Sequence, residues 1–213
     1  MILPGAGRKS WATALMSSAE AESQQPEARF DNSARQTLIQ IARDSIETAL
    51  RTGVSLAVKV SEYSGELCEN RACFVTLRCA YHTLRGCIGS SEAVRSLVED
   101  VAYNAWMAAS VDERFEPIAL EELEQLHIHI SVLSPLEPLQ ATSEEELLEQ
   151  VRPGVDGILI IEGQQRGTLL PVVWEMVPDA RCFLHEVRRK AGLPGDYWSD
   201  TMTIFRYTAE SFD

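Results

Sequence analysis

The chain has 213 residues, of which 45% are hydrophobic, and this is enough for one ordinary domain with a buried core. With 19 basic and 32 acidic residues its formal net charge is −13, whereas a nucleic-acid surface needs a basic stripe. No apolar run reaches the length of about 18 residues that a membrane span needs. Composition therefore argues against nucleic-acid binding and against a membrane protein.

The five cysteines cannot all pair, and their spacing lacks the pattern of a secreted disulfide scaffold; they are Cys68, Cys73, Cys79, Cys87 and Cys182. A reducing, cytoplasmic location is expected. The apolar stretch after Arg8 and Lys9 is too short for the core of a signal peptide. Residues 1–30 are rich in Ser, Ala, Glu and Gln without periodicity, which predicts a mobile tail before a domain at 31–213.

The first predicted element is a helix, capped near Asp31 and ended at Gly53, because apolar residues follow at helical spacing from Leu38 to Leu50. Residues 72–77 predict a strand. A second helix is expected from Ser91, with one buried stripe formed by Val94, Leu97, Val98, Val101, Ala105, Ala108 and Ala109.

Residues 126–133 alternate strictly, which predicts a strand with His127 and His129 on its polar face. Pro135 and Pro138 are expected to end it. A short acidic helix after Ser143, a hairpin of 157–162 with 166–170, a helix near 181–191 and a last strand at 201–207 follow. Helices and strands interleave without a βαβ repeat, so the fold class is α+β rather than doubly wound.

The segment Leu84–Ser90 is the most unusual of the chain, with Cys87 between Gly86 and Gly89 and Arg85 close before it. We expect a loop here that runs into a helix starting at Ser90 or Ser91. The positive helix end and Arg85 would then favour a thiolate at Cys87. Cys87 and Arg85 are therefore candidate catalytic residues, or part of a small-anion site. The alternative is a buried structural cysteine at a glycine-rich turn.

Several sharper motifs are absent from the sequence. Ala93 stands where a phosphatase-type loop would have arginine, and no glycine-rich nucleotide loop or paired CxxC zinc motif occurs. No cofactor and no metal site are predicted. A cysteine nucleophile usually needs a base, but His82 and His185 give no clear indication of that role. His127 and His129 could line a cleft or bind a metal, or simply form the polar face of an edge strand.

Seven segments together resemble the AMMECR-one domain family from about Ser33 to the C-terminus. They are Phe74–Leu77, Leu84–Ser90, Asp112–Pro117, Ile130–Ser134, Pro153–Gly157, Leu169–Pro171 with Val173 and Trp174, and Lys190–Pro194. The resemblance implies a compact α+β fold, with a mostly antiparallel sheet flanked by helices and a smaller second lobe. It implies no agreed activity.

Bacterial and archaeal members of that family resemble component A of the three-part AmmeMemoRadiSam system. The resemblance therefore implies a Memo-like protein and a radical S-adenosylmethionine enzyme as partners. It also marks a signature loop and presumed cleft lined by Leu84, Gly86, Ile88, Gly89, Arg114, Phe115 and Pro171. Val172 stands where a glutamine is expected.

Two functional hypotheses follow from the sequence. In the first, the protein is an accessory component of that system, centred on the cysteine loop. In the second, it is an enzyme in which the Cys87 thiolate attacks a small anionic substrate. The oligomeric state is left open.

Overall fold

A computed structural model describes residues 29–79 and 83–213. Most of the expected N-terminal tail, and His82, lie outside these residues. Arg29 and Phe30 belong to the folded part, because Phe30 is buried in the core and its ring lies 6.3 Å from that of Phe212. Within the described residues, no helix is long and apolar enough to cross a membrane.

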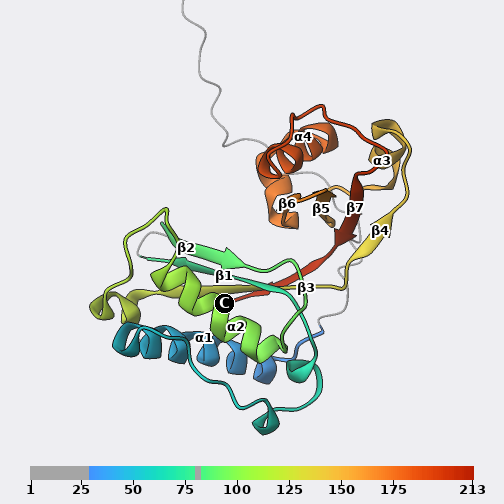
Figure 1. Ribbon diagram of the computed structural model, residues 1–213. Helices are drawn as coiled ribbons and strands as arrows, with labels where there is room; N and C mark the ends of the chain where they lie inside the picture. The colour runs from blue at the N-terminus through green and yellow to red at the C-terminus, as the bar shows by residue number, and fades with distance from the viewer. Residues whose placement is uncertain (1–28, 80–82) are drawn as a thin grey trace, which may run out of the picture.

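The first lobe, residues 29–134 with 208–213, is an antiparallel sheet in the strand order β2-β1-β3-β8. Its strands are β1 (Cys73–Arg78), β2 (Leu84–Gly89), β3 (His127–Leu133) and β8 (Ala209–Phe212). Two helices, α1 (Asn32–Thr52) and α2 (Leu97–Ser110), cover one face of the sheet (Figure 1). The 3-10 turns of this lobe are η1 (Val60–Glu62), η2 (Gly65–Cys68) and η4 (Leu120–Gln125).

Side-chain alternation on β1 separates the two faces of this sheet. Cys73, Val75 and Leu77 are fully buried in the cluster that also contains the apolar side chains of α1 and α2. Phe74 and Thr76 alternate with them and are only half-buried. They lie on the face opposite the helices, which we call the open face.

The second lobe, residues 135–207, is a smaller antiparallel sheet in the order β4-β7-β5-β6. Its strands are β4 (Glu137–Leu139), β5 (Gly157–Glu162), β6 (Gln165–Leu169) and β7 (Thr203–Tyr207), and its helices are α3 (Glu144–Gln150), η5 (Pro171–Met176) and α4 (Ala180–Lys190). The end of α4 packs closely on β6, since a Cβ on Gly167 would lie 2.4 Å from the Ala191 nitrogen.

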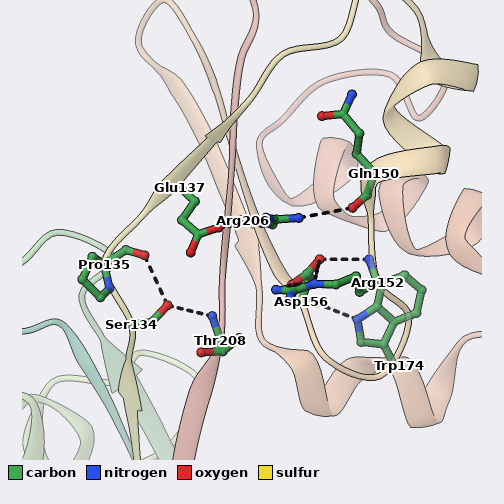
Figure 2. Close-up of polar contacts among 9 residues, drawn as sticks. All are labelled: Ser134, Pro135, Glu137, Gln150, Arg152, Asp156, Trp174, Arg206 and Thr208. Carbon is green, nitrogen blue, oxygen red and sulfur yellow. Dashed lines mark hydrogen bonds and ion pairs between the residues drawn. The ribbon is translucent and has the colours of Figure 1, made fainter. Parts of the chain in front are cut away.

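The chain crosses between the lobes twice, and the two crossings are hydrogen-bonded to each other. The Ser134 N–H donates to the Thr208 carbonyl oxygen at 2.9 Å. The Thr208 N–H donates to Ser134 Oγ, also at 2.9 Å (Figure 2). The second lobe lies over the open face of the first sheet (Figure 1). Buried Ala72, Leu133, Leu159 and Tyr207 form one small core between the sheets.

The expected α+β class, with antiparallel sheets flanked by helices, is confirmed. The first helix, its Asp31 cap and its Gly53 end, at φ 80°, are as predicted. The second helix is not: it begins at Leu97 after its cap Ser96, and Val94 is 61% exposed. The helix therefore begins six residues, nearly two turns, after the expected start at Ser91, and lies farther along the chain from Cys87 than expected.

Two further expectations need correction. The segment 84–89 is strand β2 and not a loop. Thr203–Tyr207 is not the last strand, because β8 follows it and completes the first sheet. Pro138 lies inside β4, which is an edge strand, and an edge position tolerates the missing proline N–H.

Candidate functional site on the open face

Cys87 lies on the edge strand β2, directly opposite Thr76 of β1. Its side chain is half-buried, and its Sγ lies 3.3 Å from Thr76 Oγ1. Cys73 provides the contrast within the same sheet: it is fully buried on the helix-covered face, and burial raises the pKa of its thiol well above the ordinary value. Of these two thiols, only that of Cys87 is accessible to a small molecule.

A short turn after α2 supplies hydrogen-bond partners for the backbone N–H and carbonyl oxygen of Cys87. The Cys87 N–H donates to Asp112 Oδ2 at 2.9 Å, and Arg114 Nη2 donates to the Cys87 carbonyl oxygen at 2.8 Å. On an edge strand, this N–H and this carbonyl oxygen point away from the sheet. Without Asp112 and Arg114 they would need water or another strand as hydrogen-bond partners. The hydrogen bond from Arg114, with smaller help from the Cys87 N–H, lowers the pKa of Asp112 to about 2.

The two glycines of β2 are required by packing and not by turns. A Cβ on Gly86 would lie 2.1 Å from the carbonyl oxygen of Ala108, so the glycine lets α2 approach the strand. A Cβ on Gly89 would lie 2.3 Å from the ring of Phe74, which crosses β2 on the open face. The glycine pattern that suggested a loop therefore reflects close contacts on both faces of a strand.

Arg85 contributes to the structure next to the thiol. Its Nε and Nη2 hold the Glu122 carboxylate at 2.9 and 3.0 Å, and Nη1 and Nη2 reach the carbonyl oxygens of Glu116 and Pro117. The ion pair with Glu122 also raises the pKa of Arg85. These bonds fix the segment after Arg114, and they leave Arg85 poorly placed to hold a substrate.

Two other cations interact with Cys87, one from each lobe: Arg114 through the Cys87 carbonyl oxygen, and Lys190 only through its charge. Arg114 lies over the Phe115 ring at 5.5 Å, and its pKa is raised chiefly by Asp112 and in smaller part by Cys87. Lys190 is the last residue of α4. Lys190 is an exposed residue, but partial desolvation of its ammonium group lowers its pKa. The nearby charge of Arg114 lowers this pKa further, whereas the interaction with Cys87 raises it. Lys190 therefore lies close enough to interact electrostatically with both.

The row of open-face residues that contains Cys87 continues across the sheet. Thr76 is opposite His129 of β3, and His129 Nδ1 lies 2.6 Å from Asp213 Oδ1, just beyond β8. Strand β3 lies inside the sheet, so His129 is not on an edge strand. Within the described residues, no three His, Cys, Asp or Glu side chains form a group that could hold a metal ion, and the histidine metal-site alternative gains no support there.

The structure thus brings together some of the predicted residues and not others. Cys87, Arg114 and Phe115 meet, whereas Ile88 packs against the core on the helix-covered side of β2. Leu84 is half-buried at the start of β2, where a register shift pairs it with Arg78. Pro171 begins η5 in the second lobe, which places the Trp174 ring 3.9 Å from that of Phe183.

Thr76, Asp112 and Lys190 were missed as site residues. Strand alternation could have identified Thr76, but nothing local in the sequence indicates that Asp112 and Lys190 approach Cys87. Their positions depend on a turn and on a helix end from the other lobe.

The features described so far define a class: a two-lobed α+β protein with an accessible thiol on the sheet face between the lobes. The AMMECR1 family model matches residues 39–212, and the chain belongs to that family. A protein from Methanothermobacter thermautotrophicus is 39% identical over 178 residues, which covers 83% of this chain and 92% of that protein.

Two further archaeal relatives support the same conclusion. A Methanocaldococcus jannaschii protein is 36% identical over 182 residues, covering 82% of this chain and 87% of the relative. The crystal structure of an uncharacterised protein from Pyrococcus horikoshii matches with a TM-score of 0.75 and 36% identity, covering 82% of this chain and 88% of that one. None of these proteins has a named activity, so the family is one of uncharacterised function.

Proposed function

We propose that the open face around Cys87 is a site for a small anionic compound, which Cys87 engages as a thiolate nucleophile. The observation that carries this proposal is the accessible Cys87 thiol, which has Thr76 Oγ1 at 3.3 Å and interacts with the cations Arg114 and Lys190. Two cations favour binding of a carboxylate or phosphate beside the thiol. Arg85 positions the neighbouring turn in this proposal and does not touch the substrate.

Each group has a separate role in the reaction. The thiol loses its proton, the sulfur forms a bond to an electrophilic carbon or phosphorus, and the leaving group takes the bonding electron pair away. Arg114 and Lys190 hold the anionic part of the substrate. Since the two cations come from different lobes, the site is complete only when the second lobe lies over the open face.

A pair of alkylating reagents tests this arrangement in the full-length protein. Iodoacetate and iodoacetamide transfer similar groups to sulfur with loss of iodide, but only iodoacetate is an anion. Measured by mass spectrometry for each cysteine, the iodoacetate-to-iodoacetamide rate ratio is expected to be at least about tenfold higher at Cys87 than at Cys182. Inorganic phosphate should suppress this preference.

Substitution of the second-lobe cation provides the control. Lys190→Gln should lower the ratio at Cys87, while Arg189→Gln, on the adjacent exposed residue, should leave it unchanged. An equal ratio at Cys87 and Cys182 in the unmodified protein would contradict an anion site around the thiol.

We propose in addition that the protein acts in the cytoplasm as the accessory component of an AmmeMemoRadiSam system. Its partners would be a Memo-like protein and a radical S-adenosylmethionine enzyme. Family membership supports this part of the proposal, and the thiol site is its functional centre. Affinity purification of the full chain from its own organism should recover one or both partners, and recovery of neither would contradict the partnership without affecting the thiol chemistry.

A further inference from the structure

Four polar side chains form one row across β2, β1 and β3 of the first sheet, and the row ends just beyond β8. Cys87 on β2 is opposite Thr76 on β1, Thr76 is opposite His129 on β3, and His129 is hydrogen-bonded to Asp213 beyond the end of β8. Directly opposed residues of antiparallel strands project to the same face, with Cβ atoms about 4.5–5.5 Å apart. The row therefore lies on the open face, where the thiol is accessible.

The bonds at the two ends of the row determine which atoms can accept a proton. Thr76 Oγ1 and Cys87 Sγ are 3.3 Å apart, so the hydroxyl can accept from the thiol and still donate onward. At the other end, an Asp213 carboxylate can only accept, so His129 Nδ1 carries the hydrogen of the 2.6 Å bond. In the neutral ring, Nε2 is then left as the acceptor.

We propose that Thr76, His129 and Asp213 form a proton relay that removes the proton from the Cys87 thiol. The inference rests on the proposed thiolate function and supplies the base which that function needs. The thiol proton passes to Thr76 Oγ1, and the threonine hydroxyl proton passes to His129 Nε2, directly or through one water molecule. The products are a thiolate, an unchanged threonine and an imidazolium held by Asp213, so protons and charge balance.

The charged groups on either side support this direction of transfer. At one end of the row the Asp213 carboxylate lies against the His129 ring, and at the other end the Arg114 guanidinium is bonded to the Cys87 carbonyl oxygen. Arg78 and His127 are the next pair along the same face, beside Thr76 and His129. His127 is therefore a matched control, because it has the same ring on the same strand face but lies outside the row.

The rate of Cys87 alkylation by iodoacetamide, followed from pH 5 to 9 in the full chain, tests the relay. Because iodoacetamide is neutral, the reading does not depend on anion binding. His129→Gln should slow Cys87 at pH 7 by about tenfold or more and move the rise of the rate to higher pH. Asp213→Asn should act in the same direction, and His127→Gln should have no effect.

Substitutions at the bridging hydroxyl separate the relay from loss of packing. Thr76→Val, which keeps the shape but removes the hydroxyl, should slow Cys87 as much as His129→Gln does. Thr76→Ser should restore the rate, and neither change should alter the circular dichroism spectrum. Nitrogen chemical shifts of the His129 ring in the unmodified protein give a reading that needs no variant, and they should show the hydrogen on Nδ1.

The outcomes distinguish failure of the relay from failure of the site. Fast labelling of Cys87 that His129→Gln leaves unchanged, or a ring with its hydrogen on Nε2, would overturn the relay and leave the thiolate proposal standing. Slow labelling of Cys87 in the unmodified protein, equal to that of buried Cys73, would overturn both.

Discussion

The two faces of the first sheet place the same residue type in opposite surroundings. On the helix-covered face, Cys73 is fully buried, its N–H donates to Asp100 at 3.0 Å, and burial together with that carboxylate raises the pKa of its thiol. On the open face, Cys87 is half-buried, bonded to a hydroxyl and influenced by two cations. The comparison teaches that the strand face, more than the glycines along the chain, determines whether a cysteine of this sheet is buried in the core or accessible.

Gly86→Ala should have the largest effect, because it disturbs the packing on the covered face. A Cβ there would lie 2.1 Å from the Ala108 carbonyl oxygen, and a backbone atom of α2 cannot move aside without displacing the helix. We expect a loss of about 3 kcal/mol in the free energy of unfolding, measured by urea denaturation.

Gly163→Ala is the matched control for that change. Nothing lies within 4 Å of its added Cβ, so the only penalty is the φ of 59°, about 1–2 kcal/mol. If Gly86→Ala were no more destabilising than this control, the close approach of α2 to β2 would be contradicted.

Asp112→Asn should come next, and its effect should depend on pH. The folded pKa of about 2 is below the ordinary 3.8, so the ionised carboxylate stabilises the fold above that ordinary value. This contribution, about 2 kcal/mol, is lost as the pH falls from about 4 toward 2. The free energies of unfolding of the unmodified protein and of Asp112→Asn should be measured at pH 7 and at pH 3. The difference between them should be smaller at pH 3.

Glu113→Gln is the control for Asp112, since Glu113 is an exposed neighbour on the same turn. It should follow the unmodified protein at both pH values. A constant difference between Asp112→Asn and the unmodified protein across this range would contradict the role of the carboxylate at the edge of β2.

The smallest effect concerns the two cysteines themselves. Cys73→Ala removes a fully buried side chain and should cost about 1 kcal/mol of stability through the cavity it leaves. Cys87→Ala removes a half-buried one and should change stability by less than about 0.5 kcal/mol. Thermal unfolding of both variants checks this order, and the reverse order would mean that Cys87 is the structural cysteine.

Local sequence patterns predicted much of the fold because the relevant signals are local. The Asp31 cap, the alternation in 126–133 and the hairpin around Gly163 each depend on neighbouring residues, and the structure has them where they were expected. The segment 84–89 was predicted wrongly because its glycines are needed for close packing against Ala108 and Phe74. These two residues are distant in the sequence, so a local pattern does not reveal the contacts.

The contacts around the candidate site could likewise be predicted only in part. Cys87 and Arg114 were identified from their sequence and family motifs, but the role of Arg85 was not, since Glu122 lies 37 residues further along the chain. His129 was noticed without its connection to Cys87, which runs through the register of three strands. Lys190 comes from the other lobe, at the end of the helix that packs on Gly167, and no local sequence pattern indicates its interaction with Cys87.

The most direct test of the central claim is iodoacetamide labelling of the native full-length protein at pH 7, followed at each cysteine by mass spectrometry. The account predicts that Cys87 is labelled first, about tenfold or more ahead of Cys182, whose pKa Asp179 raises, while Cys73 is not labelled until the protein unfolds. Labelling of Cys87 only on unfolding, together with Cys73, would contradict an accessible thiolate on the open face.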